Sequence, residues 1–160
     1  MPHLYSLESE KETQSNFSPH IVKNEEKLLR LVYAPEHVVG GNVIETAISL
    51  DDLKCRGLSL DRLAFANKEI ILARITVQMK NCPDKREEAS LSKFTCSDIR
   101  NIKNDSQVFL IIDDAVKENK AHAAIFINKE SGTGKSALRR ARATLIAYLQ
   151  DRHHLHSLFP

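Results

Sequence analysis

The chain has 160 residues, of which 42% are hydrophobic and 28% are charged, so it can bury a core and is not a disordered polymer. Its formal net charge of +2 at pH 7 is too small for a protein that coats nucleic acid without selectivity. The three cysteines are widely spaced and form no Cys-x-x-Cys pair, which argues against a disulfide framework and against a thiolate zinc site. The composition therefore predicts one globular domain in a reducing compartment.

The hydropathy pattern gives no sign of a membrane segment. No apolar stretch approaches the roughly 18 residues that a membrane-spanning helix needs. The N-terminus also lacks a basic segment followed by an apolar one, as a signal peptide would have. We therefore expect a cytoplasmic protein that does not bind a membrane.

The first 26 residues differ in composition from the rest of the chain. Residues 1–26 are rich in Ser, Glu, Lys and Asn and show no sustained hydrophobic period. We expect them to form a flexible or extended arm. Residues 27–160 then form a single domain.

Several short apolar runs predict strands. The first, residues 27–33, is stopped by Ala34-Pro35, and residues 108–112 and 123–127 are rich in β-branched or other apolar side chains. Residues 43–50 follow a Gly-Gly-Asn turn and are interpreted as a second, shorter strand. Residues 90–96 alternate weakly and favour a strand, followed by a short turn at 97–100. Residues 58–63 fit either a strand or a loop.

Two stretches have helical spacing. Residues 68–82 place Ile71, Leu72, Ile75, Met79 and Cys82 on one face before Pro83 ends the helix. Residues 135–151 do the same with Leu138, Ala141, Leu145, Tyr148 and Leu149. The charged run at residues 85–88 is interpreted as a solvated loop. Together these elements predict an α+β fold, in which a small mixed or antiparallel sheet is covered by two amphipathic helices.

A glycine-rich loop lies between the last predicted strand and the last predicted helix. Such a loop at a helix N-terminus can hold a phosphate with its backbone N–H groups. The spacing departs from the nucleotide-binding pattern, however, because Lys129 stands where the first glycine is required. We therefore favour a turn that caps a basic helix, and keep phosphate binding as the weaker alternative. The residues that would hold the anion are Gly132, Gly134, Lys135, Ser136 and Arg139.

A second group of polar residues follows the predicted strand ends and turns. It comprises Arg30, His37, Ser59, Arg62 and His122, with Asp61 beside them. Functional groups often lie at such positions, and two histidines could divide acid and base catalysis between them. The alternative is that each histidine is a buried hydrogen-bonding residue of the core. If the two form a site, we expect both imidazoles to face one pocket together with Arg62.

The same residues carry a resemblance. The chain contains Arg30, Pro35-x-His37, Thr46-Ala47, Leu58–Arg62 and Asn119-x-Ala121-His122-Ala123, the last after Asp113-Asp114. This series resembles a family of small, uncharacterised bacterial proteins with the pattern R…P-x-H…S-A…L-S-V-D-R…D-x-x-x-x-N-P-A-H-A. The resemblance spans residues 28–127, and Lys120 replaces the proline of that pattern. It implies a bacterial origin and indicates which residues to test, but it implies no activity.

The C-terminal region adds little evidence for a site. His153, His154 and His156 have no neighbouring acid or cysteine that favours a designed metal centre, so we predict no metal and no cofactor. The basic last helix could meet a phosphate backbone, but without a platform of aromatic residues nucleic acid is not favoured.

Two functions remain open from the sequence. The favoured one is a cytoplasmic accessory protein that binds a partner protein through the acidic arm or the basic last helix, in an operon-encoded or defence-type complex. The alternative is a small enzyme that acts on a phosphate-bearing or nucleotide-like substrate through Arg30, His37, Ser59, Arg62 and His122. We favour the accessory role because the sequence contains no short motif that places a catalytic acid and a catalytic base at a fixed spacing.

Overall fold

The computed structural model describes residues 10–11 and 14–160. Its centre is a six-stranded antiparallel sheet with the strand order β10-β5-β1-β4-β9-β8. These strands are β1 (Lys27–Pro35), β4 (Leu58–Arg62), β5 (Arg86–Thr95), β8 (Phe109–Asp113), β9 (His122–Ile127) and β10 (Arg152–His153). The α+β fold class and the antiparallel alternative are thus confirmed.

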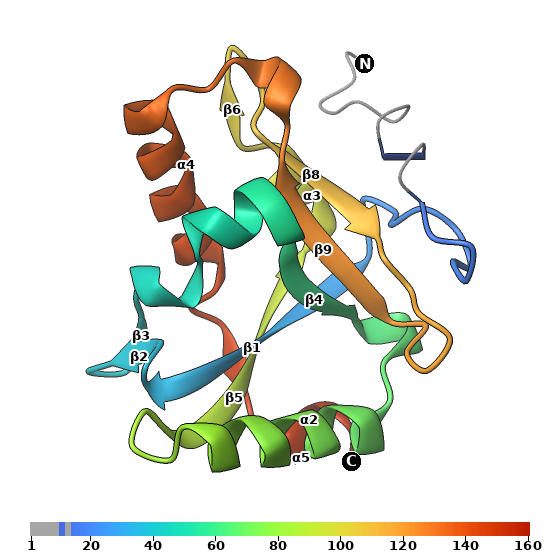
Figure 1. Cartoon of the computed structure of the whole chain (residues 1–160), viewed down its shortest axis with the longest axis vertical. Helices are drawn as coiled ribbons and strands as arrows, with labels where there is room; N and C mark the ends of the chain where they lie inside the picture. Colours follow the sequence, from blue (N-terminus) through green and yellow to red (C-terminus); the bar gives the residue numbers. More distant parts are fainter. Residues whose placement is uncertain (1–9, 12–13) are drawn as a thin grey trace.

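Two helices lie on opposite faces of this sheet (Figure 1). Helix α4 (Lys135–Tyr148) buries Leu138, Ala141 and Leu145 against a large core that includes Val32 of β1. Helix α2 (Lys68–Asn81) buries Ile71 and Ile75 against the other face of β1 and β5. Because successive residues of a strand point to opposite faces, β1 contributes to both clusters, and its near-continuous apolar sequence follows from that position.

Shorter elements connect these layers. Strands β2 (Val38–Val39) and β3 (Asn42–Val43) form a small hairpin, and β6 (Lys103–Asn104) and β7 (Ser106–Gln107) form another. Short 3-10 turns lie at η1 (Glu45–Ala47), η3 (Leu63–Phe65) and η4 (Lys129–Ser131), and η2 (Asp52–Arg56) is a short π-helix. Helices α3 (Cys96–Arg100) and α5 (Leu155–Leu158) complete the fold.

Several expectations from the sequence were wrong in detail. The expected strand over residues 43–50 is wrong beyond Val43, which ends β3, because the buried side chains at Val43, Ala47 and Ile48 follow the spacing of helical turns and not an alternation. Only Lys85 of the charged run 85–88 lies in a turn, since Arg86 begins β5 and pairs with Glu36. The expected turn at 97–100 is the helix α3. Residues 58–63 are resolved as a strand over Leu58–Arg62.

The predicted helix faces also need correction at one residue each. Leu72 of α2 is 49% exposed and Tyr148 of α4 is 37% exposed, so neither belongs to the buried face. In α2 the buried positions are four residues apart, and Leu72 follows directly after Ile71, which rotates its side chain out to solvent. None of the helices in the described ranges combines the length and the apolar character needed to cross a membrane.

The part of the N-terminal arm that the structure describes packs against the domain. Val22 is fully buried in the larger core, and the carboxylate of Glu10 pairs with the buried guanidinium of Arg100 at 2.9 Å. Glu10 also accepts a hydrogen bond from the backbone N–H of Ile111, at the outer edge of β8. The remaining residues of the predicted arm, 1–9 and 12–13, lie outside the described ranges.

Candidate functional site

The site is a fork in the sheet between β1 and β4. Strand β1 pairs with β5 along its whole length, but with β4 only at Leu28↔Arg62 and Leu29↔Asp61. Beyond these pairs the two strands separate, as Figure 1 shows. Backbone carbonyls that face the gap therefore lack a strand partner, and another donor must satisfy them.

Arg30 supplies that donor. Its guanidinium reaches across the fork, where one Nη donates to the carbonyl of Ser59 and the other to the carbonyl of Ala47, both at 3.0 Å. Its Nε–H is buried and has no acceptor among the described residues. Burial lowers the pKa of Arg30 to about 10, so the side chain is still a cation at neutral pH.

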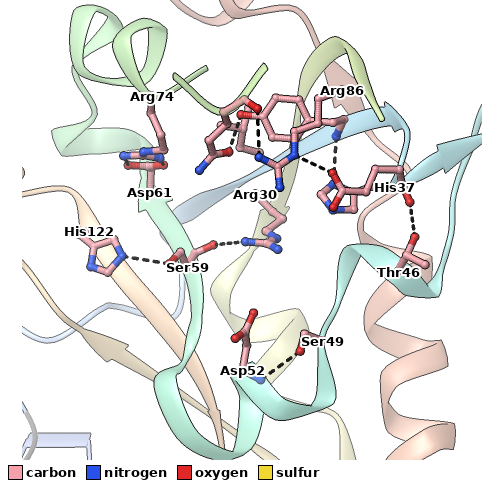
Figure 2. Close-up of a pocket in the computed structure, with 14 residues that line it drawn as sticks. Arg30, His37, Thr46, Ser49, Asp52, Ser59, Asp61, Arg74, Arg86 and His122 are labelled. Carbon is pink, nitrogen blue, oxygen red and sulfur yellow. Dashed lines mark hydrogen bonds and ion pairs between the residues drawn. The ribbon is translucent and has the colours of Figure 1, made fainter. Parts of the chain in front are cut away.

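A pocket of about 400 Å³ opens over this guanidinium. Its lining is mostly polar and comes from β1, the turn between β1 and β2, the segment between β3 and β4, β4 itself, α2, β5 and β9. Figure 2 shows Arg30 in the middle of this pocket, with Ser59 and His122 to one side and His37 to the other. The lining residues are Arg30, Leu31, Tyr33, Glu36, His37, Thr46, Ser49, Asp52, Ser59, Asp61, Arg74, Gln78, Arg86 and His122.

Two further arginines of the pocket are already paired with acids. Arg74 from α2 makes a bidentate contact with Asp61 of β4, at 2.6 and 3.1 Å. Arg86 donates to Glu36 at 2.7 Å. These pairs form two walls of fixed geometry and largely cancel their own charges.

His37 is a buried residue with one ring nitrogen already occupied. The backbone N–H of Tyr33 donates to its Nδ1 at 3.1 Å, so the ring proton resides on Nε2. That Nε2 lies 3.6 Å from a carboxylate oxygen of Glu36. Burial lowers the pKa of His37 to about 4, which keeps the imidazole neutral at pH 7. It can therefore donate a hydrogen bond, but it is a poor base.

His122 has the opposite arrangement. Its Nδ1 lies 3.0 Å from the carbonyl oxygen of Asp114 and 3.2 Å from the carboxylate of the same residue. Its Nε2 lies 3.3 Å from the hydroxyl of Ser59. Both neighbours of Nδ1 can only accept, so Nδ1 carries the proton and Nε2 presents its lone pair to the hydroxyl.

The register of the sheet explains this contact. Strands β4 and β9 pair at Asp61↔His122 and Ser59↔Ala124, so His122 is a near neighbour of Ser59 on the adjoining strand. Asp114 follows directly after β8, the strand on the far side of β9. Three adjacent strands thus each supply one of the three groups.

The structure brings four of the five predicted site residues together. Arg30, His37, Ser59 and His122 line the pocket, whereas Arg62 does not. Arg62 follows Ser59 by three positions on the same strand, and an odd separation directs the two side chains to opposite faces. It is fully buried there and pairs with Asp113 and Glu26.

Sequence reasoning missed the two paired arginines of the pocket walls. Arg74 had a detectable signal, because it falls on the buried face of α2 between Ile71 and Ile75. A cation at such a position needs a buried acid, and Asp61 meets that need. Arg86 had no comparable signal within its charged run.

The glycine-rich loop lies outside this pocket. Gly132, Gly134, Lys135, Ser136 and Arg139 contribute nothing to its lining. Gly132 adopts a left-handed conformation with φ 63°, and the loop is closed by its own hydrogen bonds, among them that from the backbone N–H of Glu130 to the side chain of Asn128. The loop leads directly into α4, for which Gly134 is the N-terminal flanking residue.

The C-terminal histidines also lie apart from the pocket. His153 faces Asp151 at 3.0 Å, and the rings of His154 and His156 stack at 5.7 Å. Within residues 10–11 and 14–160, no cluster of three His, Cys, Asp or Glu side chains has the arrangement to hold a metal ion.

Comparison with known proteins gives no match to a family model, to a curated protein or to a solved structure.

Proposed function

We propose that this protein is a small enzyme that acts on a phosphate-bearing substrate in the fork pocket, with Arg30 as the residue that binds the phosphate. One observation carries the proposal: no described carboxylate lies within ion-pair distance of Arg30, although Arg74 and Arg86 beside it are both paired. Two backbone carbonyls use only two of its five N–H groups. An incoming anion would supply the missing counter-charge.

The charges around the pocket favour this location. Three lining cations, Arg30, Arg74 and Arg86, face three lining acids, Glu36, Asp52 and Asp61. Asp52 is itself paired with the exposed Arg56 at 2.6 Å, outside the pocket lining. Arg30 is therefore the one cation of the described lining without an ion-pair partner, although the more distant carboxylates of Asp52 and Asp61 partly offset the lowering of its pKa by burial. A guanidinium in such a position recognises phosphate or carboxylate oxygens with paired hydrogen bonds.

The two histidines would then have different roles. His122 has the tautomer of a general base, with Nε2 free to accept a proton from a hydroxyl or from water. His37, neutral and protonated at Nε2, would serve as a hydrogen-bond donor to the substrate. This division replaces the expectation that both histidines share acid and base catalysis.

The accessory role has less support from the contacts of the arm. Two of its acidic residues, Glu10 and Glu26, are used in buried or nearly buried ion pairs with Arg100 and Arg62. Those carboxylates are not available to a partner protein. We therefore rank the enzyme above the accessory protein, which the sequence alone favoured.

Phosphate binding at Arg30 is tested by titration of the full chain with inorganic phosphate and with nucleoside monophosphates. Calorimetry and thermal unfolding measure the binding. A ligand at about 100 times its Kd should stabilise the fold by about 2.7 kcal/mol. Hydrogen bonds to a charged group contribute about 1.5–3 kcal/mol, so Arg30→Gln should weaken binding by at least about tenfold.

Two control variants locate the binding site. Arg140→Gln removes an exposed cation of α4, and Lys135→Ala removes the cation of the glycine-rich loop. Both should bind phosphate as the unmodified chain does. Binding that survives Arg30→Gln but is lost in Lys135→Ala would place the anion at the glycine-rich loop and refute the proposal. The absence of binding by any phosphate compound would refute it as well.

A further inference from the structure

A row of three side chains runs from the rim of the pocket to the end of β8. The hydroxyl of Ser59 lies 3.3 Å from Nε2 of His122, and Nδ1 of His122 lies 3.2 Å from the carboxylate of Asp114. The order is hydroxyl, imidazole and carboxylate, and the partners of Nδ1 fix the tautomer in which Nε2 accepts. The same order activates serine nucleophiles on several unrelated folds.

The hydroxyl end of this row lies at Arg30, the residue proposed to bind the phosphate. Arg30 donates a hydrogen bond to the backbone carbonyl of Ser59, so its guanidinium contacts the same residue that carries the hydroxyl. Ser59 is exposed, which leaves its hydroxyl open to the pocket. A phosphoryl group held by Arg30 would therefore lie next to the Ser59 hydroxyl.

We propose that Ser59 is a catalytic nucleophile toward phosphate esters, with His122 as its base and Asp114 as the residue that positions His122. The inference rests on the proposed function, because it uses the same pocket and the same anchor. It adds the reaction type, which is displacement at phosphorus through a covalent serine intermediate.

The reaction balances as two displacements. In the first, Nε2 of His122 takes the proton of the Ser59 hydroxyl, Oγ bonds to phosphorus, and the bond from phosphorus to the ester oxygen breaks. The departing alcohol oxygen takes the proton from Nε2. In the second, His122 removes a proton from water, the water oxygen bonds to phosphorus, and the bond between phosphorus and Oγ breaks. Ser59 regains its proton from His122, and the net reaction is hydrolysis of the ester.

The pocket also contains a serine that serves as the matched control. Ser49 lines the same pocket, but its hydroxyl accepts a hydrogen bond from the backbone N–H of Asp52 at 3.2 Å. No histidine is bonded to it among the described residues. A reagent that merely enters the pocket would meet both hydroxyls, whereas a reagent that needs an activated nucleophile would select Ser59.

The experiment uses a fluorophosphonate, which modifies activated serines with loss of fluoride, on the full chain at neutral pH. Peptide mass spectrometry locates the label, and its rate is measured for each variant. We expect the label on Ser59 and none on Ser49. Because general base catalysis contributes about 10²–10⁴-fold, His122→Gln should slow labelling by at least about 100-fold. Ser59→Ala should abolish it.

Asp114 is tested by a rescue. Asp114→Asn should slow labelling by at least about tenfold, because the amide lacks the negative charge that stabilises the imidazolium of His122, while the backbone carbonyl of residue 114 still holds the proton on Nδ1. Asp114→Glu should recover part of that loss, and both variants should keep the melting temperature of the unmodified chain. Equal labelling rates in Asp114→Asn and the unmodified chain would remove Asp114 from the mechanism.

The outcomes separate this inference from the proposed function. If phosphate binding depends on Arg30 but Ser59 is not labelled, or is labelled equally in His122→Gln, the nucleophile is refuted and the phosphate site stands. If Ser59 is labelled through His122 but phosphate compounds do not bind, the nucleophile stands and the phosphate anchor is refuted. Turnover of carboxylic esters in place of phosphate esters would overturn the assigned substrate class.

Discussion

Replacing Arg62 with methionine tests how much the fold depends on its buried charges. Arg62 is fully buried on the face of β4 opposite Ser59, where it pairs with Asp113 and, at 2.6 Å, with Glu26. Methionine keeps much of the volume but leaves the two carboxylates without their cation. Removing one partner of a buried ion pair costs about 3–5 kcal/mol. Domains of this kind have stabilities of about 5–15 kcal/mol, so the change should remove a large part of the total.

An exposed ion pair of the same length provides the control. Arg56 and Asp52 are also 2.6 Å apart, but the side chain of Arg56 is 79% exposed. Arg56→Met removes the same chemical group and should cost less than about 1 kcal/mol, because solvent screens such a pair. The two substitutions remove the same chemical group, but they differ in burial and in the number of carboxylates that lose their cation, which is two for Arg62 and one for Arg56.

Urea unfolding followed by circular dichroism measures both changes as shifts in midpoint at constant slope. Asp113→Asn introduced into the Arg62→Met chain should then restore part of the lost stability, because it removes one of the two charges that have lost their partner. A loss below about 1.5 kcal/mol in Arg62→Met, or equal losses in both arginine variants, would refute the reasoning that burial sets the cost.

Three further predictions follow from the same structure. Burial lowers the pKa of His37 to about 4, so the stability that its neutral form contributes is complete above pH 6.5 and falls as the pH drops toward about 4. His37→Asn should flatten the dependence of the free energy of unfolding on pH in this range. Cys55 is exposed, whereas burial raises the pKa of Cys96 to about 12, so a thiol reagent at neutral pH should modify Cys55 quickly and Cys96 only after unfolding. Gly57 and Gly41 have similar backbone angles, with φ 83° and φ 81°, but a Cβ at Gly57 would meet side chains of β9 at 2.6–2.8 Å, whereas one at Gly41 would meet nothing within 4 Å. In urea unfolding, Gly57→Ala should therefore lower the free energy of unfolding by about 1–3 kcal/mol more than Gly41→Ala does.

The elements that could be predicted from the sequence are those whose local pattern matches their final environment. The apolar runs at β1, β8 and β9 are buried on both faces, and the periodic spacing of α4 matches its buried stripe. The start of β5 could not be predicted, because Arg86 at its first position pairs with Glu36, which directly follows β1 and lies 50 positions away. A pattern of neighbours along the chain does not contain that information.

The candidate site divides in the same way. Ser59 and His122 are 63 positions apart, and their proximity depends on the register between β4 and β9. The sequence indicated which residues to consider, because polar side chains interrupt apolar strands there. It also grouped Arg62 with them, since the strand or loop at 58–63 was ambiguous and the face of each side chain was therefore undetermined.

Arg30 links the architecture to the proposed chemistry. On β1 it stands between Leu28 and Val32, which point to the same face and are fully buried. A hydrophobic residue at this position would continue the core, and replacing a buried charge by an apolar side chain is often neutral or stabilising. The chain instead carries a guanidinium whose carbonyl partners exist only because β1 and β4 separate, and whose charge is unmatched by any described carboxylate within ion-pair distance. Departures from the best local choice are concentrated at functional sites. A buried cation without an ion-pair partner stabilises the fold less than an apolar side chain would, and this is the physical reason for proposing the function at the fork pocket.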